Sequence, residues 1–173
     1  MSIENNPLVK QSPHKYGAVP FDEIKQEHFI PALEYAIKNA EAILDEVKNN
    51  TDTATFENTA LPLETCSELI ETISLTYFNL MGAESGNDFK ELAQQISPKL
   101  SAFSNTVHLD SKLFIKVKYL YENMESENLN AEQKRLISES YKGFTLNGAL
   151  LNDTDKENVR NIDEELSKLS PKF

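Results

Sequence analysis

The sequence contains one cysteine and only five glycines among its 173 residues. Because Cys66 has no partner, no disulfide can form within the chain, which is typical of a protein from a reducing compartment. No apolar run approaches the ~18–20 residues that cross a bilayer, and the first residues lack a basic stretch followed by an apolar one. We therefore expect a cytoplasmic protein with no membrane contact.

Positive charge is also scarce. Acidic residues number 28 and basic residues 17, which gives a net charge of −11. Such a charge repels phosphate backbones and anionic lipids, so it argues against nucleic acid and membrane surfaces as partners. Hydrophobic residues make up 39% of the chain, which is enough apolar surface for a folded core.

The chain lacks the motifs that mark common catalytic and binding sites. It has no nucleophile elbow, no glycine-rich phosphate loop and no EF-hand ligand pattern. Its histidines, His14, His28 and His108, never stand four residues apart, the spacing that places two zinc ligands on one helix face. Pro31 and Ala32 stand where a second imidazole would follow His28. We predict a cap-region or surface role for His28, and no catalytic, cofactor-binding or metal-binding residue in this chain.

The other reactive side chains are better explained by packing or by solvation. Cys66 lies on an apolar helical stripe, where burial raises the pKa of a thiol and makes it less reactive. The pairs of carboxylates have the spacing of solvated helix faces, and the aromatic residues have the spacing of a core, although they could also line a groove. The carboxylates are Glu164, Glu165, Asp155 and Glu157, and the aromatic residues are Tyr77, Phe78, Phe103, Phe114 and Tyr121.

Apolar residues recur at spacings of three and four almost throughout, which predicts an all-α fold. We expect about six amphipathic helices in an antiparallel bundle-like array over residues 25–173. Pro98 falls inside one of them and predicts a kink. The helices are expected over residues 26–49, from the segment 55–59 to residue 81, from Asn87 or Asp88 to 107, from Asp110 or Ser111 to 124, from Asn130 to 146, and from Asp153 or Thr154 to the end.

Residues 1–24 are expected to form an extended N-terminal arm. Three prolines and a glycine in this stretch oppose regular structure. Its apolar side chains, Leu8, Val9, Tyr16 and Phe21, predict an arm that is held against the helices.

Several segments carry a resemblance to a known family. They are Asn5-Asn6-Pro7-Leu8, residues 20–32 (PFDEIKQEHFIPA), residues 55–59 (TFENT), residues 77–80 (YFNL), Leu109-Asp110 with Leu113-Phe114 and Val117, residues 144–149 (FTLNGA) and residues 165–173 (ELSKLSPKF). In order and spacing they resemble the opening of the thimet oligopeptidase-like zinc metallopeptidases. They are more similar to the bacterial peptidyl-dipeptidases, or dipeptidyl carboxypeptidases, than to oligopeptidase A.

The resemblance implies an enzyme that hydrolyses short peptides with one zinc ion, held by an H-E-x-x-H helix and a downstream glutamate. Those residues belong to a catalytic part that would lie beyond Phe173, so none of them is assigned here. The resemblance implies that this chain is the N-terminal helical domain, which walls a deep channel. We expect an inactive, truncated fragment that binds no zinc itself and whose partners are the missing catalytic half and short peptide substrates.

A freestanding helical interaction module is the alternative. The last predicted helix places Val159, Ile162, Leu166, Leu169 and Phe173 on one seam and reaches the end of the chain without a polar stop. A natural module would cap this helix, whereas a fragment would leave apolar surface exposed and prone to self-association. The seam therefore favours the fragment.

Overall fold

The fold is all-α, as predicted. The computed structural model describes residues 2–84 and 86–172, apart from the side chains of Glu84, Asn87 and Lys172, and all regular structure within them is helical. The helices are α1 (Phe29–Asn49), α2 (Leu61–Thr65), α3 (Glu68–Glu84), α4 (Asn87–His108), α5 (Ser111–Asn123), α6 (Ala131–Leu146) and α7 (Asp153–Leu169). The 3-10 turns are η1 (Ile3–Asn5), η2 (Lys15–Gly17), η3 (Gln26–His28) and η5 (Ser170–Lys172), and a single π turn is η4 (Phe56–Ala60).

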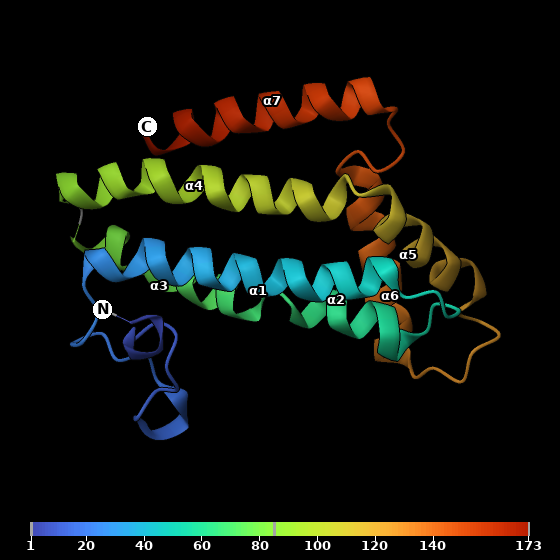
Figure 1. Cartoon of the computed structure of the whole chain (residues 1–173), viewed down its shortest axis with the longest axis horizontal. Helices are drawn as coiled ribbons and strands as arrows, with labels where there is room; N and C mark the ends of the chain where they lie inside the picture. The colour runs from blue at the N-terminus through green and yellow to red at the C-terminus, as the bar shows by residue number, and fades with distance from the viewer. Residues whose placement is uncertain (1, 85, 173) are drawn as a thin grey trace.

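Helix α1 lies at the centre of the array and contacts α2, α3, α4 and α5. Figure 1 shows that successive long helices reverse direction: α3 returns along α1, α4 runs back alongside, and α7 returns on the far side of α4, while α5 and α6 cross one end. The stripe that α1 buries has the predicted three- and four-residue spacing. Its members are Phe29, Ala32, Leu33, Ala36, Ala40, Leu44 and Val47.

Local hydrogen bonds confirm several predicted helix starts. The side chain of Asp110 accepts from the backbone N–H groups of Lys112 and Leu113, and the side chain of Asn130 accepts from the N–H of Gln133. Each bond satisfies an amide that the first helical turn leaves free. At α4 the prediction was one residue late, because the helix already includes Asn87 and its cap is Gly86.

The second predicted helix is divided in two. A π turn, η4, precedes α2, and α2 ends before Cys66, so α3 begins only at Glu68. The hydroxyl of Ser67 donates to the carboxylate of Glu71, 2.8 Å away, and the backbone N–H of Glu71 donates to the carbonyl of Ser67. The carbonyl of Ser67 thus accepts the first hydrogen bond of the new helix. The apolar periodicity hid this break because it continues across it.

Helix α4 is continuous across Pro98, so the predicted kink at that residue stays a prediction.

Helix α7 packs against the other helices through a different face from the apolar one that the sequence predicts. Lys156 is buried there, and its Nζ donates to the Ser111 hydroxyl at 2.8 Å. The predicted apolar seam is exposed instead, at Ile162, Leu166 and Leu169. Phe173, the last member of that seam, lies outside the described residues.

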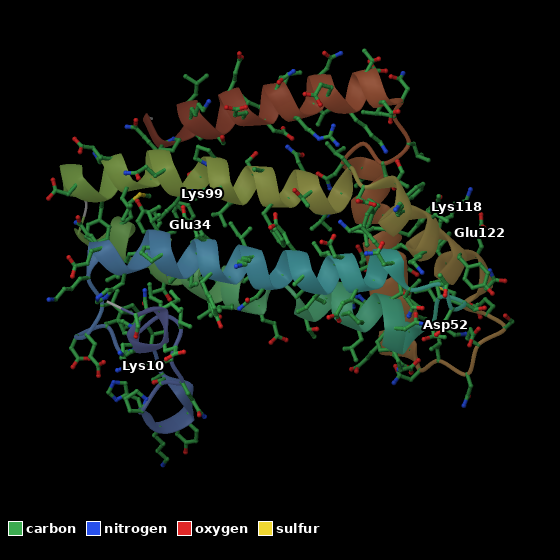
Figure 2. The ribbon with its side chains drawn as sticks, in the orientation of Figure 1. Lys10, Glu34, Asp52, Lys99, Lys118 and Glu122 are labelled. Atoms are coloured by element: carbon green, nitrogen blue, oxygen red, sulfur yellow. The ribbon has the colours of Figure 1, made fainter. Side chains whose placement is uncertain are left out.

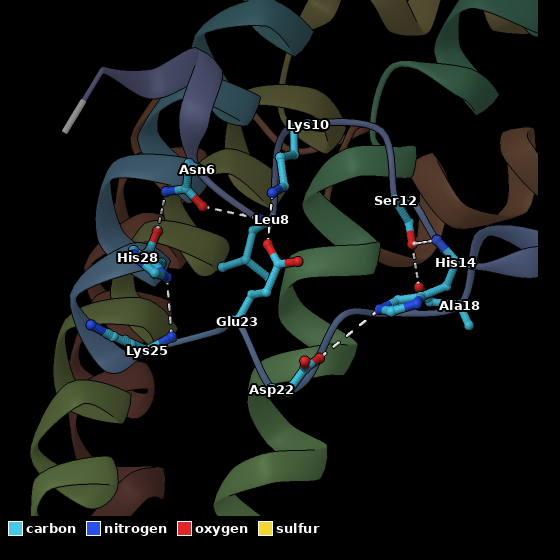
Figure 3. A network of polar contacts seen from close by, with 10 residues as sticks. All are labelled: Asn6, Leu8, Lys10, Ser12, His14, Ala18, Asp22, Glu23, Lys25 and His28. Carbon is cyan, nitrogen blue, oxygen red and sulfur yellow. Dashed lines mark hydrogen bonds and ion pairs between the residues drawn. The ribbon is translucent and has the colours of Figure 1, made fainter.

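The N-terminal arm is held at Asn6, which is buried. Its Nδ2 donates to the His28 carbonyl at 2.8 Å, and its Oδ1 accepts from the Leu8 N–H at 3.0 Å (Figure 3). Leu8 is buried, as predicted, and Val9 packs against the core. Tyr16 and Phe21 are 91% and 51% exposed, so the prediction that they hold the arm was wrong. The boundary of this arm at residue 24 stays a prediction.

Tyr77 joins three helices in the core. Its ring is fully buried and meets the ring of Phe29 edge to face, with centroids 5.2 Å apart. Its hydroxyl donates to the carbonyl of Phe89, in the first turn of α4. The same burial raises the pKa of Tyr77 to about 12. This side chain therefore connects α1 and α3 to α4 by packing and by a hydrogen bond.

We expect Tyr77→Phe to lower the free energy of unfolding by about 1 kcal/mol, because it removes a buried hydrogen bond and keeps the ring. Urea unfolding followed by circular dichroism measures the change. Tyr16→Phe is the control, since Tyr16 is 91% exposed. Equal unfolding midpoints for the two variants would contradict the role given to the hydroxyl.

Candidate functional site

The three histidines lie apart, on different elements. His14 is exposed in the arm, with its Nε2 3.9 Å from the Asp22 carboxylate, and His108 ends α4. His28 is buried, and its Nδ1 accepts the backbone N–H of Lys25 at 3.0 Å, which confirms the cap-region interpretation (Figure 3). Among the described residues, no three His, Cys, Asp or Glu side chains gather closely enough to hold a metal ion.

Cys66 packs in the core, as predicted. Its side chain is buried and its thiol donates to the carbonyl of Leu63 at 3.2 Å. Burial raises the pKa of the Cys66 thiol to about 11. At neutral pH this cysteine therefore stays a protonated thiol and is a poor nucleophile.

The carboxylates of α7 lie on solvated faces, also as predicted. Asp155, Glu157, Glu164 and Glu165 are all exposed. A hydrogen bond from Lys168 lowers the pKa of Glu164, so this carboxyl stays ionised. None of these groups is desolvated in the way that a general acid requires.

The aromatic residues are partly core and partly surface. Tyr77, Phe103 and Phe114 are buried, which confirms the core interpretation for them. Phe78 and Tyr121 are 38% and 37% exposed, so that interpretation was wrong for these two. Tyr121 instead ends an aromatic stack, in which its ring lies 4.2 Å from that of Tyr141.

Two grooves hollow the described surface on either side of α4. The first, which we call the apolar groove, lies between α2, α3, α4 and α6 and has a volume of about 600 Å³. The second, the polar groove, lies between α4 and α7 and has a volume of about 530 Å³. Phe103, although it is buried in the core, also contributes to the lining of the apolar groove.

The polar groove presents charges of both signs together with neutral hydrogen-bonding groups. Lys99 reaches across from α4 to the Glu34 carboxylate of α1, 2.7 Å away (Figure 2), and Arg160 lies 3.1 Å from the Glu157 carboxylate on α7. The neutral groups are the side chains of Ser101, Asn105, Thr106 and Asn161. The sequence did not reveal this groove, because only the packing of α7 on α4 brings its two walls together.

No described helix is both long enough and apolar enough to cross a membrane.

The sequence model of the family "Neurolysin/Thimet oligopeptidase, N-terminal domain" matches residues 33–156. The chain is 29% identical to the dipeptidyl carboxypeptidase of Salmonella typhimurium over an alignment of 171 residues. This alignment covers 99% of the chain and 25% of the relative.

Two further relatives show the same pattern of coverage. The Escherichia coli dipeptidyl carboxypeptidase is 29% identical over 97% of this chain and 25% of its own length. Oligopeptidase A of Haemophilus influenzae is 27% identical over 98% of this chain and 24% of its own length. The chain thus spans about a quarter of the length of the curated relatives that it matches.

We expect iodoacetamide at pH 8 to alkylate Cys66 about a hundredfold more slowly in the folded chain than in urea. The thiolate reacts, and raising the pKa from 9.0 to about 11 depletes it by about that factor. Mass spectrometry of timed samples measures both rates. Ser126→Cys in a Cys66→Ala background is the control and should react at similar rates in both conditions, because Ser126 is exposed. Fast labelling of native Cys66 would show that this thiol is accessible and activated.

Proposed function

Because this chain belongs to the neurolysin/thimet oligopeptidase family, with the N-terminal domain over residues 33–156, we propose that it walls the substrate channel of a cytoplasmic, zinc-dependent peptidyl-dipeptidase. Such an enzyme hydrolyses short peptides. The observation that carries the proposal is the coverage: 99% of the chain aligns with a dipeptidyl carboxypeptidase and covers only 25% of it. The proposal divides the chain into an arm, residues 1–24, and a helical N-terminal domain, residues 25–173.

The described donor side chains do not fit a catalytic zinc ion, which needs three protein ligands around one point. His14, His28 and His108 lie on different elements, and among the described residues no three His, Cys, Asp or Glu side chains surround one point. We therefore assign no catalytic, cofactor-binding or metal-binding residue to this chain. In the complete enzyme, zinc would be held by residues outside it.

We place the channel-facing wall at the polar groove between α4 and α7. A channel filled with water favours a polar lining, and a peptide in it offers amides, a free amino group and a carboxylate. Arg160 can pair with peptide carboxylates, and Asn105 and Asn161 can donate to or accept from the peptide backbone. The groove thus supplies binding and orientation, while bond cleavage is assigned to the rest of the enzyme.

A freestanding helical interaction module remains the second candidate. Such a module would bind through the exposed apolar seam of α7, where Ile162, Leu166 and Leu169 are 56%, 54% and 46% exposed, the same surface that the rest of a longer enzyme would cover. Apolar surface of this kind binds partner helices or promotes self-association. A peptidase assay separates the two candidates, because a module would have no activity at any length.

We expect the complete protein that contains this chain to release C-terminal dipeptides from a short N-terminally blocked peptide, and the 173-residue chain to release none. Removal of zinc by a chelator should abolish the activity of the complete protein, and added zinc should restore it. Chromatography of the released dipeptides measures the rate. If neither protein cleaves, the relationship to the family is one of fold, and the interaction module becomes the better account.

In the complete protein we expect Arg160→Ala to raise KM several-fold for peptides with acidic side chains and to leave kcat unchanged. The reason is that the guanidinium would contribute equally to binding of substrate and transition state. Arg135→Ala is the matched control, since Arg135 is exposed on α6, away from the polar groove. Equal KM values for the two variants would show that the channel lies elsewhere.

A further inference from the structure

The apolar groove has a hydrophobic floor that is open to solvent. Ile70 of α3, Leu100 and Val107 of α4, and Leu136 and Phe144 of α6 line it. Leu100, Val107 and Leu136 are only partly covered by the described residues. The volume of about 600 Å³ is large enough for side chains from one face of a helix.

The rim of this groove is acidic. Glu64, Glu71 and Glu139 line it, and none of the described lining residues is Lys or Arg. Glu139 also lies 3.6 Å from Lys142, but that lysine is not among the residues that line the groove. A partner that carries lysine or arginine beside its apolar residues would therefore complement both the floor and the rim.

Gly143 is the feature that points to a close approach by another backbone. It lies within α6 and lines the groove, although glycine weakens a helix interior relative to alanine. A Cβ at this position would meet only His108 Nε2, at 3.9 Å, so the described part of the chain leaves room for a larger residue. Gly148 differs, because its φ of +97° and the Leu151 and Leu109 side chains 3.0 and 3.2 Å from a Cβ require glycine there.

His108 adds a directed polar group beside Gly143. Its Nδ1 lies 3.0 Å from the carbonyl and 3.2 Å from the hydroxyl of Ser104, so local partners occupy this ring nitrogen. Nε2 is the atom that lies next to the open position at Gly143. It can form a hydrogen bond with a polar side chain of whatever docks there.

We infer that the apolar groove seats an amphipathic helix from the part of the complete protein that lies outside this chain. The helix crosses α6 at Gly143, places apolar side chains on the floor, and directs basic side chains toward Glu64, Glu71 and Glu139. The length of the relatives indicates which segment occupies the apolar groove. Relatives that match nearly the whole chain are about four times as long as it. This inference rests on the proposed function in that only a longer protein supplies the helix.

The first test compares two glycine variants in the 173-residue chain and in the complete protein. Gly143→Ala and Gly82→Ala both place alanine in a helix where the described atoms leave space, but Gly82 lies on α3 away from the groove. In the 173-residue chain each should raise the Tm by a few degrees, because alanine favours the helix. This measurement also establishes that both variants fold.

The complete protein is then cleaved at a protease site inserted after residue 173, and the dissociation constant of the two pieces is measured by dilution. We expect Gly143→Ala to weaken the association about tenfold or more, because its methyl group occupies the point of closest approach. Gly82→Ala should leave the constant unchanged.

The second test exchanges charge on the rim. Glu139→Lys should weaken the association of the same two pieces, and more strongly at low salt than at high salt. Glu122→Lys on α5 is the matched control: Glu139 and Glu122 are 60% and 58% exposed, and each lies within 3.7 Å of a lysine on its own helix (Figure 2 labels Glu122). This control should have no effect.

These results separate the inference from the proposed function. If the complete protein cleaves peptides and Gly143→Ala and Glu139→Lys behave like their controls, the docking site is wrong and the proposed function stands. Pieces that fall apart without any substitution would also overturn the docking site. If both variants weaken the association and the complete protein has no peptidase activity, the docking site stands and the proposed function falls.

Discussion

Burial of the apolar stripe on α1 is the constraint on which the other elements depend. The helix contacts α2, α3, α4 and α5, and the turns η1 and η3 also rest on it. Each fully buried side chain of the size of Phe29, Leu33 or Leu44 contributes about 1.5–3 kcal/mol to this packing. The alanines at 32, 36 and 40 have small side chains, so neighbouring helices can approach the axis of α1 closely along this stripe. The arm, the core and α4 are therefore positioned by one helix.

Much of this arrangement could be predicted from the sequence because it is local. Spacings of three and four identified the long helices, and the hydrogen-bonding side chains of Asp110 and Asn130 identified two of their starts. The spacing of apolar residues shows which residues share one face of a helix, but not which element packs against that face. The apolar seam of α7 was found correctly, yet the helix packs through Lys156 and leaves Ile162 and Leu166 exposed. The break at Ser67 was missed for a related reason, since the stripe continues across it.

The grooves were beyond sequence reasoning because each depends on elements far apart in the chain. Glu71, His108 and Gly143 share the apolar groove, although more than 30 residues separate each from the next. Gly143 carries no signal in the sequence, where a single glycine inside a helical pattern is ordinary. The structure distinguishes it from Gly148, which has a positive φ and close neighbours just after the end of α6, whereas the position of Gly143 has open space around it.

Helix α4 couples the two proposed surfaces, because each groove takes one of its walls from it. Its other contacts fix its position: Tyr77 donates to the carbonyl of Phe89 at one end, and Lys99 pairs with Glu34 of α1 in the middle. A helix seated in the apolar groove would press on Leu100 and Val107, on the side of α4 opposite to Ser101 and Asn105. Because these contacts hold α4 in one position, the walls that it gives to the two grooves keep a fixed relation to one another. The surface proposed to face substrate and the surface proposed to receive the rest of the protein therefore lie on opposite faces of one helix.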